Sequence, residues 1–209
     1  MRIGVDLDGV VAQFARGLWS ILNETTGRDV PYTDPVGWAD WSPFTENEFD
    51  VAFKRARETP GFWLNLKPYH ENVIPLRNFL IVEQDWCDVF YVTSRVETAS
   101  NCSSILAQTN EWLREHVLLR RHTSVAVVTN PQYKPAMMRA LGVRMWIDDN
   151  LSTVLDGIAD GQHAYLLSRP WNGLSEGRPT TAAMRESTVD TLAEFLDRVK
   201  DVSRCTQAK

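Results

Sequence analysis

Short runs of β-branched and apolar residues alternate along the chain with segments of helical periodicity, and this alternation constrains the fold most. Five such runs predict strands, at residues 2–8, 88–95, 124–130, 144–150 and 163–169. Strand–helix alternation is typical of a parallel sheet that helices cover on both faces. We therefore predict an α/β fold with a Rossmann-like, mostly parallel five-stranded sheet.

Residues 14–75 interrupt this alternation. They contain two helical patterns, separated by the aromatic loop YTDPVGWADWSPF and followed by the turn TPGFW. We predict a small helical cap at 14–75, inserted after the first strand of an α/β core that comprises residues 1–13 and 76–209. Pro75 is expected near the start of the next helix, because proline disrupts a helix interior.

Composition limits the classes of partner. Hydrophobic residues make up 44% of the 209 residues, so a single core of good size can form. The net charge of −5 argues against a surface that binds duplex nucleic acid, and we expect no stable nucleic-acid partner. A small anionic substrate remains compatible with this charge, because a local positive site can lie on an acidic protein.

Cysteine and histidine usage indicates neither a disulfide scaffold nor a zinc site. The three cysteines are widely spaced without a CxxC pair, and the four histidines lack ligand spacing. The chain shows no apolar signal segment and no apolar run near the ~18 residues of a membrane span. We expect a cytoplasmic protein with no membrane partner, and leave a homodimer open.

Polar side chains follow several of the predicted strands at the point where each strand ends. They are Asp6 and Asp8 after the first strand, Thr93 and Ser94 at the second, Lys134 in the helix after the third, and Asp148 and Asp149 at the fourth. Each alone has an ordinary explanation, such as a turn, a helix cap or a solvated lysine. Because the carboxyl ends of parallel strands meet at one edge, where ligands bind, together they favour a functional site.

The four aspartates would crowd their charges at this edge. Two like charges ~4 Å apart repel by roughly 4 kcal/mol at an effective dielectric constant near 20. A divalent cation would remove this repulsion, and hard oxygen ligands without histidine or cysteine favour Mg²⁺. With the hydroxyl of Thr93 and the ammonium of Lys134, such a site suits a phosphoryl group.

The four motifs resemble those of the haloacid dehalogenase-like hydrolases: DLDGV, the TS of VFYVTSR, Lys134, and the IDD of MWIDDN. Within this superfamily the chain is most similar to the 5'(3')-deoxyribonucleotidases. The segment ETPGFWLNLKP is similar to the one that joins their cap and core, and LLSRPWN to their last strand and following loop.

The resemblance implies a role for each acid. Asp6 would be the nucleophile that forms an aspartyl-phosphate, and Asp8 the general acid that later activates water as a base. Mg²⁺ would be held by the carboxylates of Asp6 and Asp148 and the backbone carbonyl of Asp8. Asp149 would either be a further ligand or hold the ligands in place through contacts with them, and we favour the second role.

The resemblance also implies the phosphate-binding groups and the substrate contacts. Thr93 and Ser94 would bind phosphate, and Lys134 would neutralise its charge. Phe62 and Trp63 would contact the substrate.

Three other aromatic residues of the cap either stack on a base or build the cap's own core: Trp38, Trp41 and Phe44. The deoxyribonucleotidases carry proline after Thr-Ser, whereas this chain has Arg95. Arg95 would either meet a second anionic group of the substrate at the rim of the site or be a surface residue.

These features favour a Mg²⁺-dependent phosphomonoesterase that hydrolyses (deoxy)ribonucleoside monophosphates through an aspartyl-phosphate. An alternative is a phosphatase of the same mechanism that acts on another small phosphometabolite or on nucleic-acid phosphate ends. A non-catalytic binding protein with the same fold is disfavoured, because Asp6 and Asp148 are both present.

Overall fold

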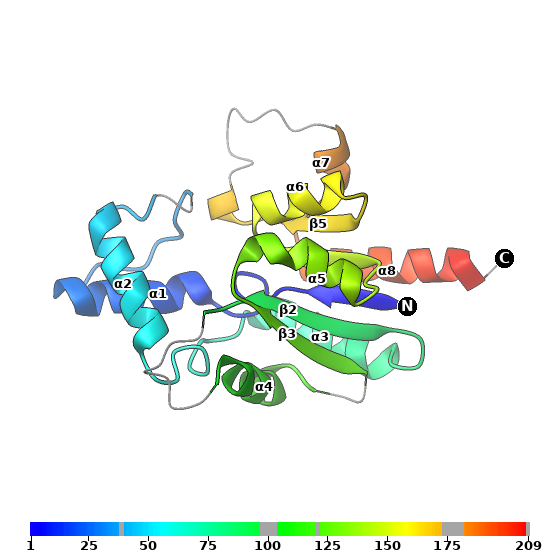
Figure 1. The fold of residues 1–209 in the computed structure, drawn as a ribbon, viewed down its shortest axis with the longest axis horizontal. Helices are drawn as coiled ribbons and strands as arrows, with labels where there is room; N and C mark the ends of the chain where they lie inside the picture. The colour runs from blue at the N-terminus through cyan, green and yellow to red at the C-terminus, as the bar shows by residue number, and fades with distance from the viewer. Residues whose placement is uncertain (38–39, 97–103, 120–121, 173–181, 208–209) are drawn as a thin grey trace.

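A six-stranded sheet forms the centre of the computed structural model, which describes residues 1–37, 40–96, 104–119, 122–172 and 182–207 (Figure 1). The strand order is β3-β2-β1-β4-β5-β6, and every neighbouring pair is parallel. The strands are β1 (Arg2–Val5), β2 (Asp88–Ser94), β3 (Thr123–Val128), β4 (Met145–Asp148), β5 (His163–Leu167) and β6 (Thr188–Val189). The predicted α/β fold is therefore confirmed.

The sheet has one strand more than predicted. β6 contains two residues, and it pairs with the end of β5 through Leu166↔Thr188 and Leu167↔Val189. Two residues are too few to show an alternation of apolar and polar positions, so only pairing in the folded protein defines this strand.

Helices cover both faces of the sheet. They are α3 (His70–Val82), α4 (Ile105–His116), α5 (Lys134–Ala140), α6 (Leu151–Ala159), α7 (Ala182–Glu186) and α8 (Leu192–Gln207), with short 3₁₀ turns at η1 (Pro131–Tyr133) and η2 (Pro170–Asn172). None of the helices within the described ranges is both long enough and apolar enough to cross a membrane.

Alternate residues of the strands supply two hydrophobic clusters. Ile3 and Val5 belong to the larger cluster, which includes buried residues of α1, α3, α4 and α8. Trp146 of β4 belongs to the smaller cluster, together with Met138 of α5 and Val154 of α6. A Cβ atom added at Gly4 would lie 2.5 Å from the sulfur of Met138, so glycine lets α5 approach β1 closely.

Two helices lie beyond the carboxyl ends of the strands, on the side away from both chain termini (Figure 1). α1 (Phe14–Thr26) and α2 (Glu46–Glu58) pack against each other. A capping box begins α2, in which Thr45 and Glu48 each accept a hydrogen bond from the other's backbone N–H.

The two segments that join this helical pair to the rest of the chain run side by side. Ala12 and Pro68 form an antiparallel bridge, the N–H of Gln13 donates to the carbonyl of Lys67 at 2.8 Å, and that of Tyr69 donates to Val11 at 2.7 Å. The inserted helices are therefore attached through a paired double connection.

The expectation for Pro75 is wrong. α3 begins at His70, which places Pro75 in its interior and puts the predicted cap boundary at residue 75 inside one helix. Contacts made before the proline explain this position. The side chain of Asn72 donates to the carbonyl of Val10 at 2.6 Å, and the N–H of Val73 donates to that of Tyr69 at 2.9 Å. These bonds fix the first turn although the ring removes a later one.

Candidate active site

Three carboxylates meet at the carboxyl edge of the sheet. Asp6 follows β1, Asp148 ends the neighbouring β4, and Asp149 comes next in the chain. The backbone N–H of Asp6 donates to the carbonyl of Ile147 at 3.0 Å, which fixes the two strand ends against each other. One carboxylate oxygen from each aspartate lies within 4.8 Å of the other two.

Lys134 lies between two of these acids. Its ammonium group is 2.9 Å from Oδ1 of Asp6 and 2.8 Å from Oδ2 of Asp148, and the residue is 3% exposed. Burial alone would lower the pKa of Lys134, but the charges of Asp148 and Asp6 outweigh it and raise that pKa above its ordinary value. Lys134 is therefore a fixed cation at the base of the site.

One lysine does not neutralise three carboxylates. Burial, followed by the charge of Asp148, raises the pKa of Asp6 well above its ordinary value. The same two causes raise the pKa of Asp149 to about 7, although a hydrogen bond from Trp171 acts in the opposite direction. Both shifts show that the site disfavours several neighbouring carboxylate charges in a place where water screens them poorly.

This donor set fits a divalent cation. The cluster offers carboxylate oxygens alone, and hard oxygen donors of this kind are the ligands that Mg²⁺ prefers. A bound cation would relieve the repulsion among these carboxylates, which is the electrostatic reason for a cation to bind here. From the sequence we expected Asp149 either as a further ligand or, as we favoured, as a residue that supports the ligands. Its carboxylate lies in the same cluster as those of Asp6 and Asp148.

The turn after β1 packs directly on Asp149. Gly9 has φ = +81°, and a Cβ atom added there would lie 2.0 Å from Oδ2 of Asp149. The carbonyl of Gly9 accepts a hydrogen bond of 2.8 Å from Nε of Arg169. Only glycine provides both the backbone conformation and the space that this contact requires.

Sequence reasoning did not single out the residues after β5 that support Asp149. The indole N–H of Trp171 donates to Oδ2 of Asp149 at 2.6 Å, and the amide of Asn172 donates to its backbone carbonyl at 3.0 Å. The similarity of LLSRPWN to a family segment was the only signal that pointed to this loop.

Asp8 belongs to a second group of side chains. Its Oδ2 accepts hydrogen bonds from Nε of Arg95 at 2.9 Å and from the hydroxyl of Thr93 at 3.3 Å. Its Oδ1 accepts one from Nη2 of Arg95 at 2.7 Å. Ser94, the last residue of β2, is half-buried.

The expected place of Arg95 at the rim or on the surface is wrong, because its side chain is 0% exposed. The bidentate ion pair with Asp8 draws the guanidinium inward. The sequence could not indicate this contact, since 87 positions separate the two residues.

The aromatic residues near the insert are buried against one another. Phe62 and Trp63 are 6% and 3% exposed, and the ring of Trp63 stacks on that of Phe14 at 5.5 Å. Trp41 and Phe44 are also buried and both contact the ring of Trp19, as expected if they build the insert's own core. Trp38 lies outside the described residues.

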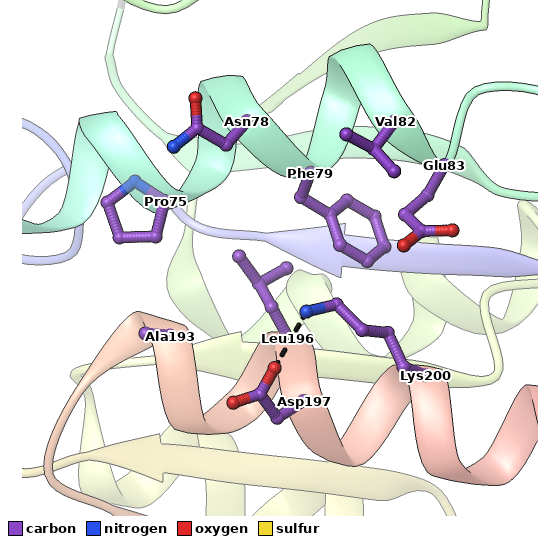
Figure 2. A pocket seen from close by; sticks show the side chains of 9 residues that line it. All are labelled: Pro75, Asn78, Phe79, Val82, Glu83, Ala193, Leu196, Asp197 and Lys200. Atoms are coloured by element: carbon purple, nitrogen blue, oxygen red, sulfur yellow. Dashed lines mark hydrogen bonds and ion pairs between the residues drawn. The ribbon is translucent and has the colours of Figure 1, made fainter.

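A surface hollow lies between α3 and α8, and Figure 2 shows its lining side chains. Phe79 and Leu196 form part of its wall, and Lys200 pairs with Asp197 at 2.7 Å. None of the predicted site residues lines this hollow, so it contributes nothing to the chemistry at the carboxyl edge.

Solved structures with the same fold come from several bacteria. A haloacid dehalogenase-like hydrolase, SP0104 from Streptococcus pneumoniae, has a TM-score of 0.57 at 10% identity over 95% of this chain and 97% of its own. A haloacid dehalogenase-superfamily hydrolase from Geobacter sulfurreducens gives 0.55 at 16% identity over 94% and 97%. A β-phosphoglucomutase-like protein from Thermotoga maritima gives 0.53 at 17% over 96% and 99%. At these identities the similarity establishes the fold alone.

Comparison with curated proteins gives no match. A family model, described as "5' nucleotidase, deoxy (Pyrimidine), cytosolic type C protein", matches residues 1–138. The matched range contains Asp6, Asp8 and Lys134, whereas Asp148 and Asp149 lie beyond it and are brought to them by the fold. The solved haloacid dehalogenase-like hydrolases have the fold that the resemblance implied. Because the family model matches more than half of the chain, the chain belongs to this nucleotidase family, which confirms the resemblance to the deoxyribonucleotidases and the predicted phosphatase class.

Proposed function

We propose that the protein is a Mg²⁺-dependent phosphomonoesterase that hydrolyses nucleoside monophosphates, with a preference for deoxyribonucleotides. The observation that carries this proposal is the cluster of Asp6, Asp148 and Asp149 around Lys134 at the carboxyl edge of the sheet. The nucleotide part of the proposal is supported by the family to which the chain belongs, which is a family of nucleotidases.

In the first step, a carboxylate oxygen of Asp6 attacks phosphorus and the bond to the leaving oxygen breaks. Asp8 donates a proton to that oxygen, so the nucleoside leaves as an alcohol. In the second step, Asp8 accepts a proton from water, the water oxygen attacks phosphorus, and the bond to Asp6 breaks. Inorganic phosphate leaves, and Asp6 and Asp8 return to their starting protonation states.

The remaining site residues bind the phosphoryl group. Lys134 offsets its charge, and Thr93 and Ser94 donate hydrogen bonds to its oxygens. Asp6 and Asp148 would hold Mg²⁺ together with the backbone carbonyl of Asp8, and Asp149 completes or supports this set. The bound cation supplies Lewis-acid stabilisation of the charge that develops on the phosphoryl oxygens.

We propose that residues 14–75 act as a cap over this site. The place of α1 and α2 beyond the carboxyl ends of the strands supports this role (Figure 1). A cap in this place excludes water during reaction and offers Phe62 and Trp63 as substrate contacts once the cap opens. The cytoplasmic location and the homodimer stay predictions.

The family membership also leaves room for a phosphatase of the same mechanism that acts on another small phosphometabolite. The net charge of −5 disfavours the third option, phosphate ends of nucleic acids. We keep these as alternative outcomes of the assay below.

A panel of ribonucleoside and deoxyribonucleoside 5'- and 3'-monophosphates and sugar phosphates tests the proposal through phosphate release. We expect release from nucleotides with Mg²⁺, loss of activity in EDTA, and a loss of at least about 10³-fold in Asp6→Asn. Asp160→Asn, which changes an exposed aspartate paired with Arg139, is the matched control and should keep full activity. Hydrolysis of sugar phosphates alone would replace the nucleotide assignment with the first alternative.

A further inference from the structure

We infer that Arg95 is a positioning residue that holds the carboxylate of Asp8 in the orientation needed for proton transfer. This inference rests on the proposed function, in which Asp8 is the general acid and base. It assigns to Arg95 a role different from the substrate contact that its sequence position suggested.

The hydrogen bonds from the guanidinium of Arg95 fix the orientation of the Asp8 carboxylate. Nε and Nη2 of Arg95 donate to separate oxygens of Asp8, at 2.9 and 2.7 Å, in the bidentate geometry that a planar guanidinium favours. Thr93 donates to Oδ2 from the neighbouring strand end at 3.3 Å. Since both oxygens are bound, the carboxyl group cannot rotate without breaking the ion pair.

Arg95 itself is held by elements on two sides. Its Nη1 donates to the hydroxyl of Thr109 at 2.8 Å, and that hydroxyl donates to the carbonyl of Ile105 within α4 at 2.7 Å. The ring of Trp63 lies 4.7 Å from the centre of the guanidinium. Arg95 thus connects Asp8 to α4 and to the segment that follows the inserted helices.

This environment disfavours a direct contact between Arg95 and substrate. The side chain is 0% exposed, whereas that of Asp8 is 16% exposed. The carboxylate of Asp8 binds one edge of the guanidinium, and the hydroxyl of Thr109 accepts from another of its N–H groups. The ring of Trp63 covers one face of the guanidinium. A substrate anion would have to break the pair with Asp8 in order to reach Arg95.

The expected kinetic consequence depends on the leaving group. A nucleoside alkoxide is a poor leaving group and needs the proton from Asp8, whereas p-nitrophenolate leaves without one. Misplacement of Asp8 should therefore slow the first step for nucleotides much more than for p-nitrophenyl phosphate.

The experiment measures single-turnover release of nucleoside and of p-nitrophenol, and the steady-state KM for each substrate. The proteins compared are the wild type, Arg95→Gln, Arg95→Lys, Asp8→Asn and the double variant Arg95→Gln/Asp8→Asn. We expect Arg95→Gln to slow nucleoside release about 100-fold and p-nitrophenol release less than about 10-fold, with little change in KM. Arg95→Lys keeps the positive charge but cannot form the bidentate pair, so its rate of nucleoside release should lie between those of the wild type and Arg95→Gln. In the Asp8→Asn background, Arg95→Gln should add no further loss.

Arg198→Gln is the matched control for the loss of an arginine, because Arg198 on α8 bonds Glu194 and two carbonyls away from the site. It should leave the ratio of the two release rates unchanged. Should Arg95→Gln slow both substrates equally, or raise KM for nucleotides alone, the positioning role is overturned in favour of a structural or a substrate-binding role.

A crystal structure of Arg95→Gln supplies a readout that does not need turnover. A displaced or disordered Asp8 carboxylate supports the inference, and an unmoved one overturns it. Thr109→Val removes the acceptor of Nη1, together with the hydroxyl's own bond to the carbonyl of Ile105, and gives a milder test should Arg95→Gln fail to fold. A wild type that hydrolyses no phosphomonoester would count against the proposed function, while the Asp8 position would still decide the role of Arg95.

Discussion

At the scale of single residues, the site depends on a turn that tolerates no added volume. Gly9 combines a positive φ with a contact that would place a Cβ atom 2.0 Å from the carboxylate of Asp149. Gly27, which ends α1, has φ = +66° with nothing within 4 Å of its would-be Cβ atom. A substitution at Gly27 therefore measures the cost of the backbone conformation alone. The same substitution at Gly9 adds the cost of displacing Asp149.

We predict that Gly27→Ala lowers the free energy of unfolding by about 1 kcal/mol, the cost of a left-handed backbone, and leaves phosphatase activity intact. Gly9→Ala should cost more and should reduce activity strongly, because it moves Asp149. Urea unfolding and phosphate release check both variants. Equal stability losses with full activity in both would show that the contact between Gly9 and Asp149 is unimportant.

Cysteine reactivity provides a second test at this scale. Burial raises the pKa of the Cys87 thiol to about 12, whereas Cys205 is exposed. Because the pKa of this thiol is higher in the folded chain than in the unfolded chain, its contribution to stability is fully present at pH values below the unfolded pKa of about 8.5. This contribution is lost as the pH rises through about 12. We expect iodoacetamide at pH 8 to modify Cys205 rapidly and Cys87 only after unfolding, as mass spectrometry of peptides can show. Rapid labelling of Cys87 in the native protein would contradict this burial.

The positions of the acids could be predicted because they depend on a topological rule, while that of Arg95 could not. Asp6 follows one strand and Asp148 ends another, and parallel strands bring their carboxyl ends to one edge whatever the rest of the chain does. The direction of a long side chain depends instead on partners such as Asp8 and Thr109, which no local pattern identifies.

At the scale of helices and strands, long periodic segments were predicted well and short or proline-containing ones were not. β6 consists of two residues, and α3 continues through Pro75 because contacts of Asn72 and Tyr69 hold its first turn. In both places tertiary contacts outweigh the local preference of the sequence.

A buried hydrogen bond joins α4 to the segment after the inserted helices. The indole N–H of Trp112 donates to the carbonyl of Leu66 at 2.7 Å, and Trp112 is 0% exposed. We predict that Trp112→Phe costs about 1–3 kcal/mol of stability, because it leaves a buried carbonyl without a donor. Chemical denaturation measures the loss.

Trp86→Phe is the control for this prediction. The indole of Trp86 donates to the half-buried carboxylate of Glu83, which water can reach after the substitution. This variant should cost less than Trp112→Phe. A reversed order would mean that ring packing, and not the hydrogen bond, dominates at both positions.

At the scale of the whole molecule, folding brings together acids from distant parts of the chain. Asp6 lies near the start, whereas Asp148 and Asp149 lie beyond the range that the family model matches. Their mutual repulsion opposes folding, and Lys134 offsets only part of it. A cation that binds this cluster binds only the folded chain, so it should stabilise the fold as a whole.

We therefore predict that Mg²⁺ raises the melting temperature of the wild type. A ligand at about 100 times its Kd contributes about 2.7 kcal/mol, which corresponds to roughly 5–10 °C for a chain of this size. Asp148→Asn should lose most of this shift, because it removes a carboxylate from the centre of the cluster. Asp160→Asn, at an exposed ion pair, should keep it. Thermal unfolding in EDTA and in a Mg²⁺ series measures each shift, and an equal shift in the wild type and Asp148→Asn would place the cation elsewhere on the protein.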